Sequence, residues 1–192
     1  MANSAHGGFD GGAVAADGTV EKDINLIISE KIRDLLVMDG YNVIMTRNSD
    51  TGTENDSSIS IAKRKKSDLE NRLALMSENP DSIYVSIHLN KYTTSSAFGT
   101  QVFYSKNVDA SKELGQYIQG AVVSMIQPEN KRVVKKGSDS TYLLKNAKVP
   151  TVIVECGFLS NVKELELLKS DDYQSKMAFA VFSGITNFYE GK

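Results

Sequence analysis

The two histidines of the sequence and one glutamate lie where predicted loops meet regular elements. His6 precedes two glycines, Glu21 lies at the start of a predicted helix, and His88 follows an apolar run rich in β-branched residues. Two imidazoles and one carboxylate are a common ligand set of catalytic zinc, with the fourth position open to water. Because α/β proteins place functional residues at strand ends, these three side chains form a candidate zinc site.

Taken one at a time, these residues have ordinary structural explanations. His6 could be a disordered terminal residue, Glu21 suits the first turn of a helix because of the helix dipole, and His88 could be a core histidine. Glu155 favours a functional explanation over these structural ones, because it directly follows the apolar strand predicted at 151–154. An unpaired charge buried there would cost several kcal/mol, and a nearby divalent metal would lower that cost.

Length and composition limit the classes of protein to consider. A chain of 192 residues suits one well-buried α/β domain. The formal net charge of -2 gives no electrostatic case for a nucleic-acid partner, and the basic run at 63–66 is best explained as a solvated face. The single cysteine excludes an internal disulfide. This does not distinguish an exported protein from a cytosolic one, because both can lack disulfides.

The sequence shows no segment that would insert into a membrane. No apolar stretch approaches the roughly 18 residues of a membrane span, and the N-terminus has neither a basic leader nor the apolar core of a signal peptide. No hydrophobic strand is predicted before His6. We therefore expect that an export signal and a first strand have been lost ahead of Met1.

Hydrophobic periodicity predicts strands that alternate with helices. The predicted strands are 41–46, 83–88, 100–104, a short one near 141–144, and 151–154. The predicted helices are 23–40, one opened by a capping box of Ser67 and Glu70, 114–125, a short one from Ser160 or Asn161, and 173–188. Residues 6–18 are predicted to be a glycine-rich loop, and about 48–66 a polar insertion. This order predicts a single α/β domain over residues 1–192, with a three-layer αβα architecture and helices on both faces of a mostly parallel, twisted sheet.

Four stretches together resemble the zinc-dependent N-acetylmuramoyl-L-alanine amidases of the family called amidase 3. They are His6-Gly7-Gly8, Glu21-Lys22-Asp23-Ile24-Asn25, Ser86-Ile87-His88-Leu89-Asn90, and Val154-Glu155-Cys156-Gly157-Phe158-Leu159-Ser160-Asn161. The resemblance covers nearly the whole chain. It implies that His6, Glu21 and His88 bind Zn²⁺, and that Glu155 is the catalytic carboxylate.

The same resemblance implies the reaction. The expected activity is hydrolysis of the amide bond between N-acetylmuramic acid and L-alanine in peptidoglycan. The polar insertion, the stretch Ser140-Thr141-Tyr142-Leu143-Leu144-Lys145-Asn146 and the length are most similar to the germination-specific spore-cortex subgroup. This implies a role in muramic-δ-lactam formation, a location on the cell-wall or spore-cortex side of the membrane, and an accessory protein in the spore as a partner.

Two other functions compete with this one. Cys156 and His88 could form a thiol hydrolase, although a cysteine at the end of an apolar strand is more often an inert core residue. The chain could also be a catalytically inactive peptidoglycan-binding or regulatory relative with an impaired zinc site. The zinc content of the purified protein would distinguish the two, because the inactive relative would lack the metal. Arg47 and Arg72 match common arginine positions of the family, and either salt bridging or substrate contact would explain them.

The segment before His6 departs from the family pattern. Relatives have Asp-x-Gly before the first histidine, whereas this chain has Asn3-Ser4-Ala5. The lost aspartate could orient the imidazole, so its absence predicts weaker zinc binding than is usual in the family.

Overall fold

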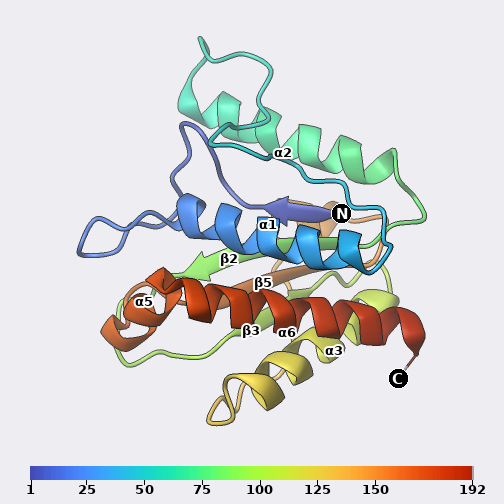
Figure 1. The fold of residues 1–192 in the computed structure, drawn as a ribbon. Helices are drawn as coiled ribbons and strands as arrows, with labels where there is room; N and C mark the ends of the chain where they lie inside the picture. Colours follow the sequence, from blue (N-terminus) through green and yellow to red (C-terminus); the bar gives the residue numbers. More distant parts are fainter. Residues whose placement is uncertain (192) are drawn as a thin grey trace.

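The computed structural model describes residues 1–191. A sheet of five strands, in the order β1-β2-β5-β3-β4, forms the centre of the fold. The strands are β1 (Ala2–Ser4), β2 (Tyr84–Asn90), β3 (Gln101–Tyr104), β4 (Lys135–Lys136) and β5 (Thr151–Phe158). β1, β2 and β5 are parallel, and β3 is antiparallel to β5. In Figure 1 the arrows of β1 and β2 point toward the end of the sheet where α1 begins.

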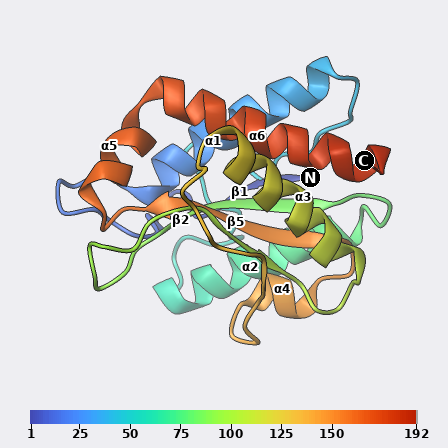
Figure 2. The same cartoon turned by 90° about the horizontal axis from the view of Figure 1, so that it is seen from below.

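Helices cover both faces of this sheet. They are α1 (Glu21–Met38), α2 (Ile61–Ser77), α3 (Ala110–Met125), α4 (Tyr142–Asn146), α5 (Val162–Lys169) and α6 (Asp171–Glu190). Figure 2 shows α1, α3 and α6 on one face, and α2 and α4 on the other. The predicted three-layer αβα fold with a mostly parallel sheet is therefore confirmed.

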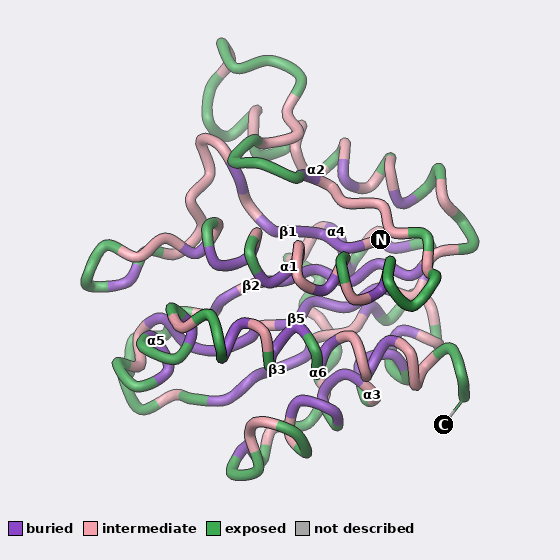
Figure 3. The backbone as a smooth tube through the Cα atoms, in the orientation of Figure 1, coloured by how far each residue is buried: buried purple, intermediate pink, exposed green. Residues whose placement is uncertain are grey.

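Alternation along the two central strands sends side chains to opposite faces. Val85, Ile87 and Val154 belong to the large core beneath α1, α3 and α6, whereas Tyr84 packs in a smaller cluster with residues of α2 and α4. Figure 3 shows these strands as the buried centre of the molecule. Because strand residues alternate with a period of two, His88 points to the same face as Tyr84.

Most predicted elements form, but four predictions are wrong. Residues 41–46 make no strand beyond a bridge between Met45 and Ala2, because β1 is only three residues long and offers little edge to pair with. The stretch near 141–144 is helix α4, which buries both Leu143 and Leu144. Adjacent apolar residues that are both buried do not fit one face of a strand.

The third correction concerns the polar insertion. Helix α2 begins at Ile61, so residues 61–66 belong to it, and the capping box of Ser67 and Glu70 does not open a helix. The Ser67 hydroxyl accepts a hydrogen bond from the backbone N–H of Asn55 instead. The expectation that the strand before His6 has been lost is also wrong, because β1 (Ala2–Ser4) forms there: its small residues give no hydrophobic signal, but their backbone pairs with β2. No helix within residues 1–191 is long and apolar enough to cross a membrane.

Candidate metal centre and catalytic carboxylate

The loop after β1 holds His6 in a left-handed backbone conformation. Its φ angle is 61°, which residues other than glycine rarely adopt. Gly7 and Asp10 exchange two backbone hydrogen bonds, of 2.9 and 3.0 Å, that close the loop. The closed loop brings Asp10 to His6, so that the imidazole Nδ1 lies 2.8 Å from the carboxylate Oδ2. This contact orients the ring and leaves Nε2 free to bind a metal.

Glu21 is the most buried of the predicted ligands, with 3% of its surface exposed. It is the first residue of α1, where the helix dipole favours a carboxylate. Its Oε2 accepts a 2.7 Å hydrogen bond from the Ala13 N–H, and its Oε1 accepts from the Leu89 N–H at 3.0 Å and from Asn25 Nδ2 at 3.2 Å. A Cβ on Gly12 would lie 2.6 Å from Glu21 Oε2, so this close approach requires glycine.

Both imidazoles converge on the same glutamate oxygen. His6 Nε2 lies 3.3 Å from Glu21 Oε1, and His88 Nδ1 lies 3.2 Å from it. The two rings meet edge to face with centroids 5.3 Å apart. One ligand atom from each residue lies within 4.8 Å of the other two. The three residues that the sequence proposed as ligands are therefore brought together, and a borderline metal such as zinc fits this nitrogen and oxygen donor set.

The charges of this cluster support one another. Burial alone would lower the pKa of His6, but hydrogen bonds to Asp10 and Glu21 outweigh it and raise that pKa to about 9. For Glu21, burial opposes ionisation, yet the two imidazoles hold its pKa well below the ordinary value. The cluster thus keeps an ionised carboxylate in a buried place, where it is stable only beside positive charge.

Glu155 lies next to this cluster on the neighbouring strand. β2 and β5 pair in register with His88 opposite Glu155, so the two side chains lie on the same face of the sheet. Burial raises the pKa of Glu155, against the opposing effect of His88. Its Oε2 is buried and has no hydrogen-bond partner among residues 1–191. A carboxyl group in this state is suited to exchanging a proton with a substrate group that enters the site.

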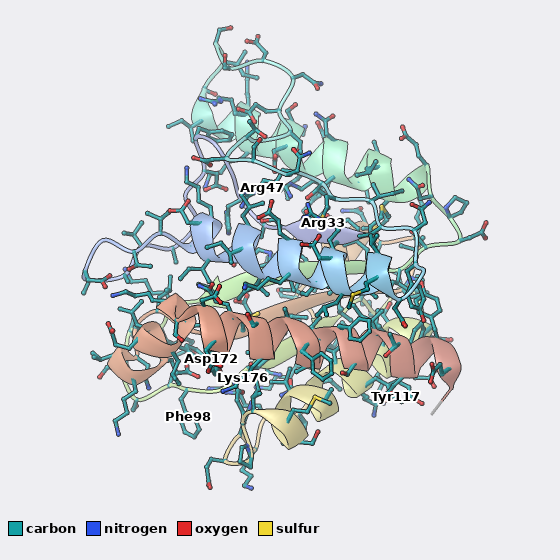
Figure 4. All side chains as sticks on the ribbon, in the orientation of Figure 1. Arg33, Arg47, Phe98, Tyr117, Asp172 and Lys176 are labelled. Atoms are coloured by element: carbon teal, nitrogen blue, oxygen red, sulfur yellow. The ribbon has the colours of Figure 1, made fainter. Side chains whose placement is uncertain are left out.

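Arg47 and Arg72 hold the segment that carries His6. Arg47 is 5% exposed and Arg72 is 2% exposed. Arg47 donates to the carbonyl oxygens of Ser4 and Lys22, and Arg72 donates to those of Ser4 and His6. Figure 4 shows Arg47 between α1 and α2. Their buried contacts with the backbone favour a positioning role over direct contact with substrate.

His6 has an orienting carboxylate, although the aspartate of the family pattern is absent from the segment before it. Asn3 donates to the Ser86 hydroxyl at 2.6 Å and is therefore a structural link between β1 and β2. Asp10, four residues after His6, supplies the carboxylate instead. The role of Asp10 was not predicted from the sequence, although the two glycines between His6 and Asp10 indicate a loop that can turn back on itself.

Cys156 does not face the cluster. Its side chain is fully buried in the large core, on the opposite face of the sheet from His88, and burial raises the pKa of its thiol well above the ordinary value. A neutral thiol in the core is a poor nucleophile. The thiol-hydrolase alternative is therefore not supported.

Comparison with known proteins agrees with this geometry. The model of the amidase 3 family, described as N-acetylmuramoyl-L-alanine amidase, matches residues 1–187. The chain belongs to this family. It is 34% identical over 187 residues to the germination-specific N-acetylmuramoyl-L-alanine amidase of Bacillus subtilis strain 168, a match that covers 97% of this chain and 78% of the relative.

Solved amidase structures share the fold. The CwlD amidase from Clostridioides difficile, in complex with the GerS lipoprotein, superposes with a TM-score of 0.94 at 39% identity, covering 99% of this chain and 97% of that one. An N-acetylmuramoyl-L-alanine amidase from Clostridium difficile 630 gives a TM-score of 0.83 at 27% identity, covering 99% and 95%. The chain therefore has the amidase fold over nearly all of the described residues.

Replacing Asp10 with asparagine should weaken zinc binding by about 10-fold to 100-fold, because the imidazole of His6 loses the carboxylate that orients it. Competition with a chromophoric chelator measures this affinity. Asp17→Asn, in the same loop region but paired with Lys169 on the surface, is the matched control and should bind zinc like the wild type. Equal affinity in Asp10→Asn and wild type would show that Asp10 does not orient the ligand.

Zinc affinity should also rise with pH. The pKa of His6 is about 9, so the metal-free imidazole is protonated near neutral pH, whereas a metal requires it to be neutral. Each unit of pH between about 6.5 and 8.5 should therefore raise the apparent affinity about tenfold, and calorimetry in buffers of different ionisation enthalpy should show about one proton released. A pH-independent affinity over this range would contradict the predicted charge of His6.

Proposed function

We propose that this chain hydrolyses the amide bond between N-acetylmuramic acid and L-alanine in peptidoglycan, using Zn²⁺. The observation that supports the proposal most directly is the convergence of His6, Glu21 and His88 beside Glu155 in a chain of the amidase family. Two imidazoles and one carboxylate leave an open coordination position, which distinguishes a catalytic zinc site from a closed structural one. The inactive-relative alternative is not favoured, because no predicted ligand is missing.

His6, Glu21 and His88 would hold the metal through His6 Nε2, a Glu21 carboxylate oxygen and His88 Nδ1. Zinc bound there supplies a Lewis acid that polarises the scissile carbonyl and lowers the pKa of water to about 7. The hydrogen bonds from Ala13, Leu89 and Asn25 would fix the Glu21 carboxylate. A ligand held in this way needs little reorganisation when the substrate binds.

Glu155 would act as general base and then as general acid. Its carboxylate would accept the proton of the attacking water and return it to the leaving nitrogen of L-alanine. The raised pKa suits this exchange, because it brings the carboxyl group closer to the pH at which the enzyme works. The product would be a glycan strand that has lost its stem peptide.

The relatives suggest where this activity is used. The chain is similar to a germination-specific amidase and to the CwlD amidase, which supports a role in the spore cortex and muramic-δ-lactam formation. CwlD was solved in complex with the GerS lipoprotein, so we further propose an accessory lipoprotein as a partner of this chain. Both proposals place the protein outside the cytoplasm, on the cell-wall or spore-cortex side.

Digestion of purified sacculi tests the reaction. The wild type should release stem peptides with free L-alanine amino termini and create no new reducing sugar ends, as measured by mass spectrometry. Glu155→Gln should lower turnover about a hundred-fold or more while keeping its zinc, because the proton acceptor is lost and the ligands are untouched. Glu166→Gln, an exposed glutamate on α5, is the control and should keep full activity.

Two outcomes would contradict this assignment. Shortened glycans that keep their stem peptides would show a glycosidase. Loss of zinc in Glu155→Gln together with retention of zinc in His6→Ala would make Glu155 a ligand and not the base.

A further inference from the structure

The sheet face that carries His88 and Glu155 continues past the metal cluster to Phe158. A β-bulge interrupts the pairing of β2 with β5 after His88, and Asn90 then pairs with Phe158. Because paired residues share a face, the bulge brings Phe158 to the same face as Glu155. Without the extra residue, Phe158 would point to the opposite face.

Arg132 lies on this phenylalanine. Its guanidinium carbon is 4.9 Å from the centre of the Phe158 ring, and its Nε donates a 2.8 Å hydrogen bond to the carbonyl oxygen of Phe98. Within residues 1–191, its two terminal nitrogens make no hydrogen bond or ion pair. Glu164 is near enough for Arg132 to favour its charged form, but its two oxygens accept from the backbone N–H groups of Gly99 and Phe158.

The other four arginines are already engaged. Arg47 and Arg72 bind backbone carbonyls, Arg64 pairs with Glu54, and Arg33 pairs with Asp34. Among the arginines of residues 1–191, Arg132 is therefore the one whose two terminal guanidinium nitrogens, its outer edge, are available to a ligand. An outer edge of this kind binds a carboxylate through two parallel hydrogen bonds.

The surroundings of Arg132 are fixed before any ligand arrives. Tyr92 meets Phe158 edge to face with ring centroids 6.4 Å apart, and its backbone N–H donates to the Ser160 hydroxyl. Asn161 donates to the carbonyl oxygen of Ala97 in the same loop between β2 and β3. Figure 4 shows Phe98 at the outer side of this loop. Arg132 is therefore held on a rigid support, which lowers the entropy lost on binding.

A second cation lies on the same face. Lys135 pairs with Phe103, which in turn pairs with Ile153, two residues before Glu155 on β5. The paired side chains share a face, so Lys135 points to the side of the sheet that carries Glu155. It is exposed and has no ion-pair partner among the described residues. Arg132 and Lys135 thus place two cations near this edge of the sheet.

We propose that Arg132, stacked on Phe158, binds the free α-carboxylate of the second, acidic residue of the stem peptide. This inference rests on the proposed function. Phe158 is three residue steps along β5 from Glu155, which is at most about 10 Å and less across a bulge. The second residue of an extended peptide lies about 7 Å from the scissile amide, at about 3.3–3.6 Å per residue. A stem peptide that is cleaved beside Glu155 and runs along β5 toward Phe158 would reach Arg132 with this carboxylate.

The test compares two synthetic muramyl stem peptides that differ only in this group, one with the free α-carboxylate and one with the carboxamide. The wild type should have a KM about tenfold lower for the carboxylate, with kcat changed less than twofold, because a charge-assisted pair is lost in the amide. Arg132→Gln should raise the KM for the carboxylate to the value for the amide. Arg132→Lys should recover part of the difference, because it keeps the charge but not the paired geometry.

Lys136→Gln is the matched control. Lys136 is exposed and pairs with Tyr104, which packs against the large core, so it points to the opposite face from Lys135. It should keep the wild-type preference. Equal KM values of the wild type for both peptides, or an unchanged preference in Arg132→Gln, would overturn the inference. If the wild type cleaves neither peptide nor sacculi, the proposed function itself fails.

Discussion

The carboxylate of Glu21 is the feature on which the candidate site depends. It is nearly inaccessible, yet it stays ionised because two backbone N–H groups, one amide and two imidazoles surround it. These groups come from three parts of the chain. The glycine-rich loop, the start of α1 and the end of β2 must therefore meet around one side chain, and the parallel pairing of β1 with β2 brings them there.

A second group of buried charges supports this meeting point from outside. Arg47 and Arg72 donate to backbone carbonyl oxygens of the segment that carries His6, and Arg72 also pairs with Asp68. Removing Arg72 would take its hydrogen bond from the carbonyl oxygen of His6, and leaving such a group unsatisfied costs about 1–3 kcal/mol. The segment that carries His6 is thus held in place by two buried arginines.

Sequence reasoning identified the fold class and the three residues that converge, because both depend on residue type and on alternation that is visible locally. It failed where the outcome depends on distant partners. Residues 41–46 alternate like a strand, but the short β1 gives them almost nothing to pair with. The role of Asp10 depends on the closure of a glycine loop, and the position of Arg132 depends on a bulge in β5. Neither leaves a periodic signal.

X-ray absorption at the zinc edge identifies the atoms around the metal without relying on activity, and so tests whether Glu21 and the two histidines bind it. The account predicts two imidazole nitrogens at about 2.0–2.1 Å and carboxylate or water oxygens at about 2.0–2.2 Å, with four ligands in all. In Glu21→Gln, zinc should be lost or its oxygen shell changed. A sulfur ligand at about 2.3 Å, or a spectrum that Glu21→Gln leaves unchanged, would contradict it.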